Sequence, residues 1–237
     1  MIIQACFNGA RPAGYHPQLP LTPEAMLRDS RACLAAGAAE LHLHPRDADG
    51  HDSLRAVDAA MAALRTACPG TLIGVSTVDW IEGDAAATRA CIAAWENLPD
   101  YASVNLSEPD APAVMALLTE KRVGIEAGLA TVADAQRFLS LPDCHRVFRV
   151  LIEIEEQHQP TADLIADDIM QLLDAAGLHR PRLLHGFDAT AWHFVRRAQE
   201  LRYSTRIGLE DVQMRPDGSI CTGNAQLVGD AVAMRQG

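Results

Sequence analysis

A repeating pattern decides the fold, and residues 34–46 show one unit of it: Leu-Ala-Ala-Gly-Ala-Ala-Glu-Leu-His-Leu-His-Pro-Arg. The Ala36-Gly37 pair is typical of a helix end, because glycine readily adopts the left-handed conformation that closes many helices. The residues that follow, Glu40–His44, form a short β-rich run. A helix followed closely by a strand indicates an α/β protein.

Similar β-rich runs recur about every 30 residues, separated by Ala/Leu-rich stretches of helical period. The predicted strands are Ile2–Phe7, Glu40–His44, Thr71–Ser76, Tyr101–Leu106, Arg122–Glu126, Arg146–Glu153, Arg182–Gly186 and Tyr203–Leu209. Helix starts are predicted at Thr22-Pro23-Glu24 and Thr161-Ala162-Asp163, and a further helix end at Ala176-Gly177. Eight such units predict a (β/α)8 barrel, the TIM-barrel fold. A doubly wound open sheet gives much the same pattern, but no GxGxxG follows the first run, so we favour the barrel.

The length and hydrophobicity fit one barrel domain over residues 1–237. The chain has 237 residues, of which 49% are hydrophobic and 22% charged. A barrel domain of this length is common. No run of 18 uncharged apolar residues is present, and the first residues read as a buried strand rather than a signal peptide. We therefore expect a cytoplasmic protein that does not cross a membrane.

The charged residues exclude several classes of protein. Lysine and arginine total 20 against 31 acidic residues, a formal charge of −11, so nucleic acid is not an expected partner. Lys121 is the single lysine, and it precedes a predicted strand rather than following one. Schiff-base aldolases, pyridoxal-phosphate enzymes and Walker loops all need a lysine at one particular place. The six cysteines form no CxxC pair and are expected to be reduced structural thiols.

Strand alternation predicts which polar side chains reach the barrel axis. The apolar residues of each strand should face the helices, so Leu41 and Leu43 turn His42 and His44 inward. The inward set predicted near the carboxyl ends of the strands is Asn8, His42, His44, Arg46, Ser76, Asn105, Glu126, Glu153, His185, Arg206 and Glu210. Burying so many polar groups costs free energy unless they have partners or a function. A functional site at this mouth is the simplest interpretation.

The pair His42 and His44 is the sharpest signal of chemistry. Two imidazoles on one face of a strand are about 6.5 to 7 Å apart in Cα, close enough to ligate one ion. The predicted first strand is flanked by the second and eighth, so Glu210 can complete a set of two histidines and one carboxylate. Such a set leaves coordination positions open for substrate, as in catalytic zinc sites. The alternative is a pair of hydrogen-bonded core histidines with a salt-bridged glutamate.

Several motifs resemble those of the β-keto acid cleavage enzymes, a family that includes the 3-keto-5-aminohexanoate cleavage enzyme. The likeness covers nearly the whole chain, and the HxHxR and RxGxED motifs are its most specific parts. The matching segments are Asn8-Gly-Ala10, Pro20-Leu-Thr-Pro-Glu24, Glu40-Leu-His-Leu-His-Pro-Arg-Asp-Ala-Asp-Gly50, Gly74-Val-Ser-Thr77, Thr205-Arg-Ile-Gly-Leu-Glu-Asp211 and Asn224-Ala-Gln-Leu-Val228.

The resemblance implies a zinc-dependent barrel that converts a β-keto acid and acetyl-CoA to acetoacetate and a new acyl-CoA. It implies Zn2+ as the cofactor, acetyl-CoA as co-substrate, and His42, His44 and Glu210 as zinc ligands. Arg206 and Asp211 would form the acid/base dyad, and Ser76 would contact the substrate and the acetyl group. Substrate contacts are further expected from Asn8, Arg11, Arg46, Thr77, Asn105, Glu126 and Glu153. We also expect a homo-oligomer.

The chain departs from the family pattern in the pocket. Arg11 follows Asn8-Gly-Ala10 where the aminohexanoate enzyme has an acid, which predicts a preference for neutral or anionic distal groups on the substrate. Many members have Ser-Thr-Gly-Gly where this chain has Ser76-Thr-Val-Asp-Trp80, which changes the floor of the pocket. Solvated loop positions are the alternative for Arg11 and Glu153, and structural hydrogen bonding is the alternative for Asn105.

Three other functions fit parts of the pattern. Barrel amidohydrolases use an HxH pair on the first strand with further histidine ligands, whereas this pair lies on the second strand and His185 is the one later strand histidine that alternation turns inward. Two histidines and a carboxylate also bind iron for oxygen chemistry. The non-enzymatic alternative is a barrel that binds a metal or metabolite without turnover. Asp211 and Arg206 argue against it, because binding alone needs no base.

Overall fold

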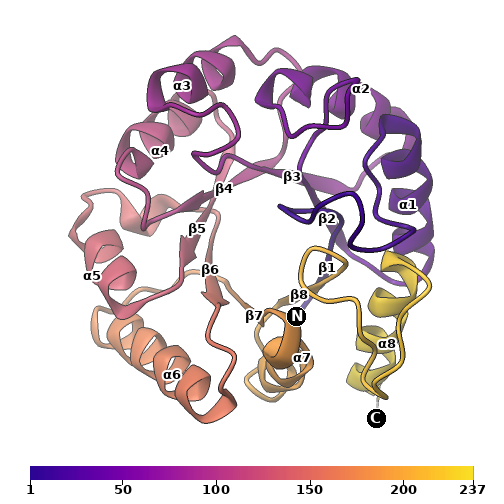
Figure 1. The fold of residues 1–237 in the computed structure, drawn as a ribbon. Coiled ribbons are helices and arrows are strands. Elements are labelled where there is room, and N and C mark those ends of the chain that lie inside the picture. Colours follow the sequence, from indigo (N-terminus) through magenta and orange to yellow (C-terminus); the bar gives the residue numbers. More distant parts are fainter. Residues whose placement is uncertain (237) are drawn as a thin grey trace.

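The computed structural model describes residues 1–236, and they form a (β/α)8 barrel (Figure 1). The strands make an inner ring, which Figure 1 shows almost end-on, and the helices surround it. The strands are β1 (Ile3–Cys6), β2 (Glu40–Leu43), β3 (Leu72–Ser76), β4 (Tyr101–Asn105), β5 (Gly124–Leu129), β6 (Arg149–Ile154), β7 (Arg182–Gly186) and β8 (Thr205–Ile207). The helices are α1 (Pro23–Ala35), α2 (Val57–Ala67), α3 (Ala85–Ala94), α4 (Ala111–Glu120), α5 (Val132–Ser140), α6 (Gln159–Ala175), α7 (Ala191–Glu200) and α8 (Asn224–Gln236).

All neighbouring strands are parallel, in the order β7-β6-β5-β4-β3-β2-β1-β8. Backbone hydrogen bonds then bring β8 beside β7: Leu184 N–H donates to Ser204 O over 2.9 Å, and Ser204 N–H donates to Arg182 O over 3.0 Å. The prediction of a (β/α)8 barrel is therefore confirmed. In this closed order β1 lies between β2 and β8, which is the arrangement that the predicted metal site requires.

Local sequence explains where the helices begin. The Thr22 side chain accepts a hydrogen bond from Ala25 N–H, and α1 starts at the following proline, as predicted. Helix α6 begins at Gln159, earlier than the predicted Thr161, because Pro160 is well suited to a first helical turn. Both predicted Ala-Gly helix ends are confirmed, since α1 ends at Ala35 and α6 at Ala175.

Seven of the eight strands differ from their predicted limits, two of them for identifiable reasons. Arg122 adopts a left-handed conformation (φ 61°) in the turn after α4, so β5 starts at Gly124 and extends to Leu129. Cys144–Arg146 form a short 3₁₀ turn, which delays the start of β6 to Arg149. Strand β7 coincides with its prediction.

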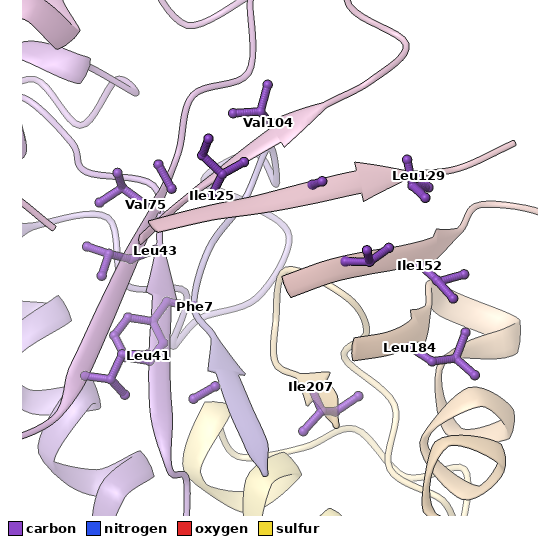
Figure 2. Close-up of a cluster of buried hydrophobic side chains, with 14 of the residues drawn as sticks. Phe7, Leu41, Leu43, Val75, Val104, Ile125, Leu129, Ile152, Leu184 and Ile207 are labelled. Carbon is purple, nitrogen blue, oxygen red and sulfur yellow. The ribbon is translucent and has the colours of Figure 1, made fainter. Parts of the chain in front are cut away.

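The hydrophobic core lies between the strands and the helices. Leu41, Leu43 and Ile207 are fully buried there, and Figure 2 shows them with the corresponding residues of the other strands. This orientation leaves the alternate residues of the same strands for the barrel interior. Within residues 1–236, no helix is both long and apolar enough to cross a membrane. All six cysteines are free thiols.

The interior at the amino-terminal end of the barrel is filled by a polar group that we call the floor cluster: Gln4, Glu40, Tyr101, Glu126 and Arg149. Arg149 Nε donates to Glu126 Oε1 over 2.5 Å, and its two terminal nitrogens donate to the two carboxylate oxygens of Glu40. Gln4 Nε2 donates to the Tyr101 hydroxyl (2.9 Å), which donates to Leu41 O (2.8 Å). The floor cluster closes the barrel beneath the candidate site.

Candidate active site

His42, His44 and Glu210 meet at the carboxyl ends of the strands, and we call these three residues the metal triad. His42 lies on β2, His44 just beyond it, and Glu210 in the turn that follows β8. The Nε2 atoms of both histidines lie 4.0 Å from Glu210 Oε1, and one ligand atom from each residue falls within a 4.8 Å cluster. The structure therefore brings together the three predicted ligands.

Backbone features of the β1 end hold the metal triad in place. Gly9 has φ +49°, and a Cβ atom there would lie 2.4 Å from Glu210 Cγ, so only glycine lets Glu210 approach the histidines. Asn8 pairs with the backbone of His44 in both directions: its Oδ1 accepts from His44 N–H and its Nδ2 donates to His44 O, each over 3.0 Å. Asn8 thus ties the end of β1 to the end of β2 and does not line the pocket.

The donor set fits a divalent transition-metal ion. The N···O separations of 4.0 Å are too long for hydrogen bonds but suit atoms that share one ion, since zinc–ligand distances are about 2.0 to 2.2 Å. Glu210 Oε2 is buried without a hydrogen-bond partner among the described residues. A buried, unpartnered oxygen on a carboxylate that lies beside two imidazoles is costly unless a cation binds there.

Burial and neighbouring charges hold His42 and Glu210 in the protonation states that bind metal. Burial lowers the pKa of His42 to about 3, so its imidazole is neutral near pH 7. Burial alone would raise the pKa of Glu210, but the adjacent Arg206 guanidinium is the main cause that lowers it to about 2. Neutral imidazole and ionised carboxylate are the ligand forms that metal binding requires.

Outer contacts orient His44. Its Nδ1 lies 3.3 Å from Asp52 Oδ1, and the ring of Trp80 stacks on the imidazole at a centroid distance of 5.9 Å. Arg46 pairs with Asp52 (3.0 Å) and donates to Gly9 O (2.5 Å). Strand β2 ends at Leu43, so the alternation that would aim Arg46 at the axis stops before it. Arg46 therefore supports the partner of a histidine ligand rather than lining the pocket.

A pocket of about 590 Å3 opens beside the metal triad. Five further predicted substrate or catalytic residues line it: Arg11, Ser76, Asn105, Glu153 and Arg206. Ser76 Oγ accepts a hydrogen bond from Val78 N–H (3.4 Å), which leaves its own hydroxyl proton free to donate into the pocket. The exposed ring of Trp80 and the ring of Phe187 supply apolar surface.

Arg206 lines the pocket and contacts both acidic residues that follow β8. Its Nη2 donates to Glu210 Oε1 over 2.7 Å and to Asp211 Oδ1 over 3.2 Å. Asp211 is fully buried behind Arg206 and does not line the pocket. The predicted dyad is thus in contact, and Arg206 is the member that faces the cavity.

Arg11 lies at the pocket with most of its guanidinium engaged. Its Nη2 donates to Asp188 Oδ1 (2.8 Å) and to Asp211 O (3.0 Å), while Nε donates to Glu210 O (3.0 Å). The guanidinium also stacks over the Tyr15 ring at 4.4 Å. Arg11 is therefore fixed, and Asp188 offsets much of the positive charge that the sequence interpretation assigned to substrate recognition.

Besides Asn8 and Arg46, two more predicted substrate contacts lie away from the pocket. Thr77 follows the last residue of β3 and its hydroxyl donates to Ser103 O over 2.7 Å. Glu126 belongs to the floor cluster, where Arg149 holds it. Both residues serve packing and hydrogen bonding in this structure.

Other residues of the site had no assigned role from the sequence. His185 lies fully buried between Glu153 and Asp211. Strand alternation had turned it inward, but its partners come from a neighbouring strand and a later turn. Asp52 and Trp80 lie in loops, where no alternation indicates direction, so nothing in the sequence pointed to their contacts with His44.

The chain was compared with known proteins and structures. It is 35% identical over 80 residues to the 3-keto-5-aminohexanoate cleavage enzyme of Acetoanaerobium sticklandii, a match that covers 32% of this chain and 29% of that enzyme. The structure of ObcA superimposes with a TM-score of 0.74 at 18% identity, covering 90% of this chain and 61% of ObcA. The type I 3-dehydroquinate dehydratase of Clostridium difficile gives 0.66 at 12% identity, over 99% of this chain and 92% of that one. The two structural matches show the fold alone.

The chain spans less than two thirds of the length of the first two of these relatives. Residues 1–140, more than half of the chain, match the family model of the beta-keto acid cleavage enzymes. The matched part contains His42 and His44, whereas Arg206 and Glu210 lie beyond it. On the strength of this match, the chain belongs to the β-keto acid cleavage enzyme family.

Proposed function

We propose that the protein is a zinc-dependent enzyme that exchanges acyl groups between a β-keto acid and acetyl-CoA, producing acetoacetate and a new acyl-CoA. The observation that carries this proposal is the metal triad beside an open pocket, in which Glu210 Oε2 has no protein partner among residues 1–236. Family membership supplies the substrate class. ObcA, which shares the fold, has been crystallised with oxaloacetate and with a C4-CoA adduct and oxalate, so a related barrel accommodates a keto acid and a CoA derivative.

His42, His44 and Glu210 would hold the ion. When bound, a zinc ion supplies Lewis acidity that polarises substrate oxygen atoms. The three side chains provide two imidazole nitrogens and one carboxylate, a set typical of catalytic zinc sites with open positions. Gly9 and Asn8 keep these ligands in register by the contacts described above.

In this proposal Arg206 and Asp211 form the pair that accepts a proton from the α-carbon of the substrate. The proton between the keto and carboxylate groups of the substrate is transferred to this pair, and the electrons of the broken C–H bond enter the enolate. Arg206 faces the pocket, and Asp211 fixes it from behind. The Ser76 hydroxyl donates a hydrogen bond to the oxyanion that develops when the thioester carbonyl is attacked.

The remaining steps form one carbon–carbon bond, break another, and move CoA from the acetyl group to the new acyl group. The α-carbon of the keto acid bonds to the acetyl carbon, and CoA leaves as its thiolate. The thiolate then adds to the original keto carbon, whose bond to the α-carbon breaks in a reverse Claisen step. The α-carbon recovers its proton, and the products are acetoacetate and the new acyl-CoA. No redox co-reactant is needed.

A screen of β-keto acids with acetyl-CoA, in which acetoacetate is measured, tests the proposal. We expect acetoacetate and an equal amount of new acyl-CoA with at least one β-keto acid, and neither product from His42→Ala protein. Oxygen consumption without acyl transfer would identify iron-dependent oxygen chemistry instead. Metal binding without turnover of any β-keto acid would indicate a binding protein.

A substitution at Asp211 separates metal binding from proton transfer. Asp211→Asn should retain metal and lose turnover by a factor of about 10² or more, because Asp211 contacts Arg206 but is not a ligand. Glu210→Gln should lose metal. If Asp211→Asn loses metal while Glu210→Gln retains it, the two roles are reversed.

A further inference from the structure

Three buried side chains and the partly buried Glu153 form a closed ring on the β6–β8 side of the pocket, which we call the charge ring: Glu153, His185, Asp211 and Arg206. His185 Nε2 lies 3.2 Å from Glu153 Oε2, and His185 Nδ1 lies 3.4 Å from Asp211 Oδ1. Arg206 Nη2 closes the ring, 3.2 Å from the same Asp211 oxygen and 3.6 Å from the same Glu153 oxygen. Carboxylates and nitrogen bases therefore alternate around the ring.

Strand register builds the charge ring. Glu153 and His185 are direct neighbours in the parallel pairing of β6 with β7, so their side chains leave the strands side by side into the barrel. Arg206 lies on β8, the next strand, and Asp211 in the turn that follows it. Glu153 and Arg206 line the pocket, whereas His185 and Asp211 are fully buried and do not.

Both nitrogens of His185 lie within ion-pair distance of carboxylate oxygens, at 3.2 and 3.4 Å, although neither contact has hydrogen-bond geometry. A neutral imidazole carries one N–H donor, so one of the two contacts would oppose a nitrogen lone pair to a carboxylate. A doubly protonated imidazolium carries an N–H on each of these nitrogens, and its positive charge attracts both carboxylates. With His185 charged, the ring contains two cations and two anions, whereas a neutral His185 leaves two carboxylates to one guanidinium in a buried site.

The directions in which the pKa values of His185 and Glu153 shift agree with this geometry. Burial and Arg206 act to lower the pKa of His185, but the contacts with Asp211 and Glu153 outweigh them and raise it. Burial alone would raise the pKa of Glu153, and the contacts with His185 and Arg206 lower it instead. The two partners thus stabilise each other's charged forms.

We propose that His185 is a positioning residue, a buried imidazolium that fixes Glu153 on the pocket wall and Asp211 behind Arg206. It does not touch the substrate. Through Asp211 it sets the direction of the Arg206 guanidinium, and through Glu153 it sets the charge that the substrate meets opposite the metal triad. The catalytic part of this inference rests on the proposed acyl exchange, but the charged state of His185 does not.

Nuclear magnetic resonance of metal-loaded, 15N-histidine-labelled protein tests the charged state directly. We expect the His185 ring, assigned by comparison with His185→Gln, to show two protonated nitrogens at pH 7.5. His193 is the internal control, because a single carboxylate, Asp163, faces one of its nitrogens at 2.7 Å. One unprotonated nitrogen in His185 would overturn the proposal, whether or not the enzyme performs acyl exchange.

Kinetics of His185→Gln test the positioning role. Glutamine keeps one donor but loses the charge and the second donor. We expect kcat to fall by about 10- to 100-fold, as for other residues that orient catalytic groups, with metal content and KM within about twofold of the unsubstituted protein. His193→Gln, which breaks a matched pair outside the barrel, should leave kcat unchanged.

Two results would contradict the positioning role. An unchanged kcat in folded, metal-loaded His185→Gln would show that the contacts of His185 with Glu153 and Asp211 are not needed for turnover. A loss of metal that accounts for the whole fall in activity would show that His185 supports the metal triad instead. If the unsubstituted protein shows no acyl exchange with any substrate, the proposed function fails, and the resonance experiment still decides the state of His185.

Discussion

The floor cluster and the mouth of the barrel are both polar, yet their hydrogen bonding differs. In the floor cluster Arg149 binds both carboxylates, Gln4 and Tyr101 are paired, and Glu126 Oε2 is the one side-chain atom without a partner. At the mouth, Glu210 Oε2, Asp211 Oδ2 and the Nδ1 atoms of His42 and His44 have no hydrogen-bond partner among the described residues. The same barrel therefore contains one polar cluster whose side chains are nearly all hydrogen-bonded and one in which several atoms lack a partner.

This difference separates a structural polar cluster from a functional one. Buried polar atoms are usually hydrogen-bonded, because an unpaired one costs about 1 to 3 kcal/mol. The floor cluster meets that rule with its own side chains. At the mouth, an ion held by the metal triad would supply the partner that Glu210 Oε2 lacks, which is why we propose the metal and the chemistry there. Four predictions test this distinction.

The largest effect is expected from removing the metal triad's histidines. Purified protein should contain about one zinc per chain, and His42→Ala/His44→Ala should lose both the metal and all acyl exchange. Elemental analysis of both proteins measures this, with the exposed His158→Ala as the control. Full zinc occupancy in the double variant would remove the basis for the ligand assignment.

The floor cluster should affect stability rather than metal binding. Arg149→Met leaves Glu40 and Glu126 buried without a cation, which should cost about 3 to 5 kcal/mol in free energy of unfolding. Urea unfolding measures the loss. Arg146→Met is the matched control, because that side chain is 63% exposed and its ion pair should contribute less than about 1 kcal/mol. Equal midpoints for the two variants would show that the floor pairing is not a stabilising feature.

A pH-dependent effect is expected from Glu108, which is buried in the loop after β4 and accepts a hydrogen bond from Asp79 N–H (3.3 Å). Burial raises the pKa of this carboxyl from 4.5 to about 7, so the folded protein binds its proton more tightly than the unfolded chain. Ionised Glu108 therefore lowers the free energy of unfolding. This loss grows as the pH rises from 4.5 to about 7 and is complete above that value. Glu108→Gln should stabilise the protein by about 1 to 3 kcal/mol at pH 8 and by little at pH 4. A benefit of equal size at both pH values would contradict this assignment.

The smallest effect is expected from Arg11. Asp188 and two backbone carbonyls already accept hydrogen bonds from the Arg11 guanidinium. The enzyme's preference for uncharged over ammonium-bearing keto acids should therefore be less than about 10-fold in kcat/KM. Arg11→Glu should narrow or reverse that preference. The ratio of kcat/KM for the amino substrate and its uncharged analogue measures it. A ratio that Arg11→Glu leaves unchanged would show that Arg11 does not read the substrate.

Strand alternation made most of the fold and the metal triad predictable. Leu41 and Leu43 define which way His42 faces, and the neighbours of β1 in a closed barrel bring Glu210 to the histidines. The same rule failed beyond the strand end at Arg46, because alternation no longer fixes direction in a loop. The single-domain assignment over residues 1–237 stays a prediction.

Partnerships across the barrel could not be read from the sequence. The pairing of Arg149 with Glu40 joins β6 to β2, and the contact of His185 with Asp211 joins β7 to a turn after β8. Both depend on the barrel's interior geometry rather than on spacing along the chain. Sequence alternation indicated that several of these side chains point inward, but it did not indicate which of them meet.

The most direct test of the proposed chemistry is to follow an isotope from acetyl-CoA labelled with 13C at the acetyl carbonyl. Acyl exchange predicts that the label appears at the keto carbon of acetoacetate, that the new acyl-CoA is unlabelled, and that the reaction requires metal and intact His42 and His44. Recovery of labelled acetyl-CoA unchanged while the β-keto acid is consumed would contradict the account, because the protein would then be a hydrolase or decarboxylase on the same barrel.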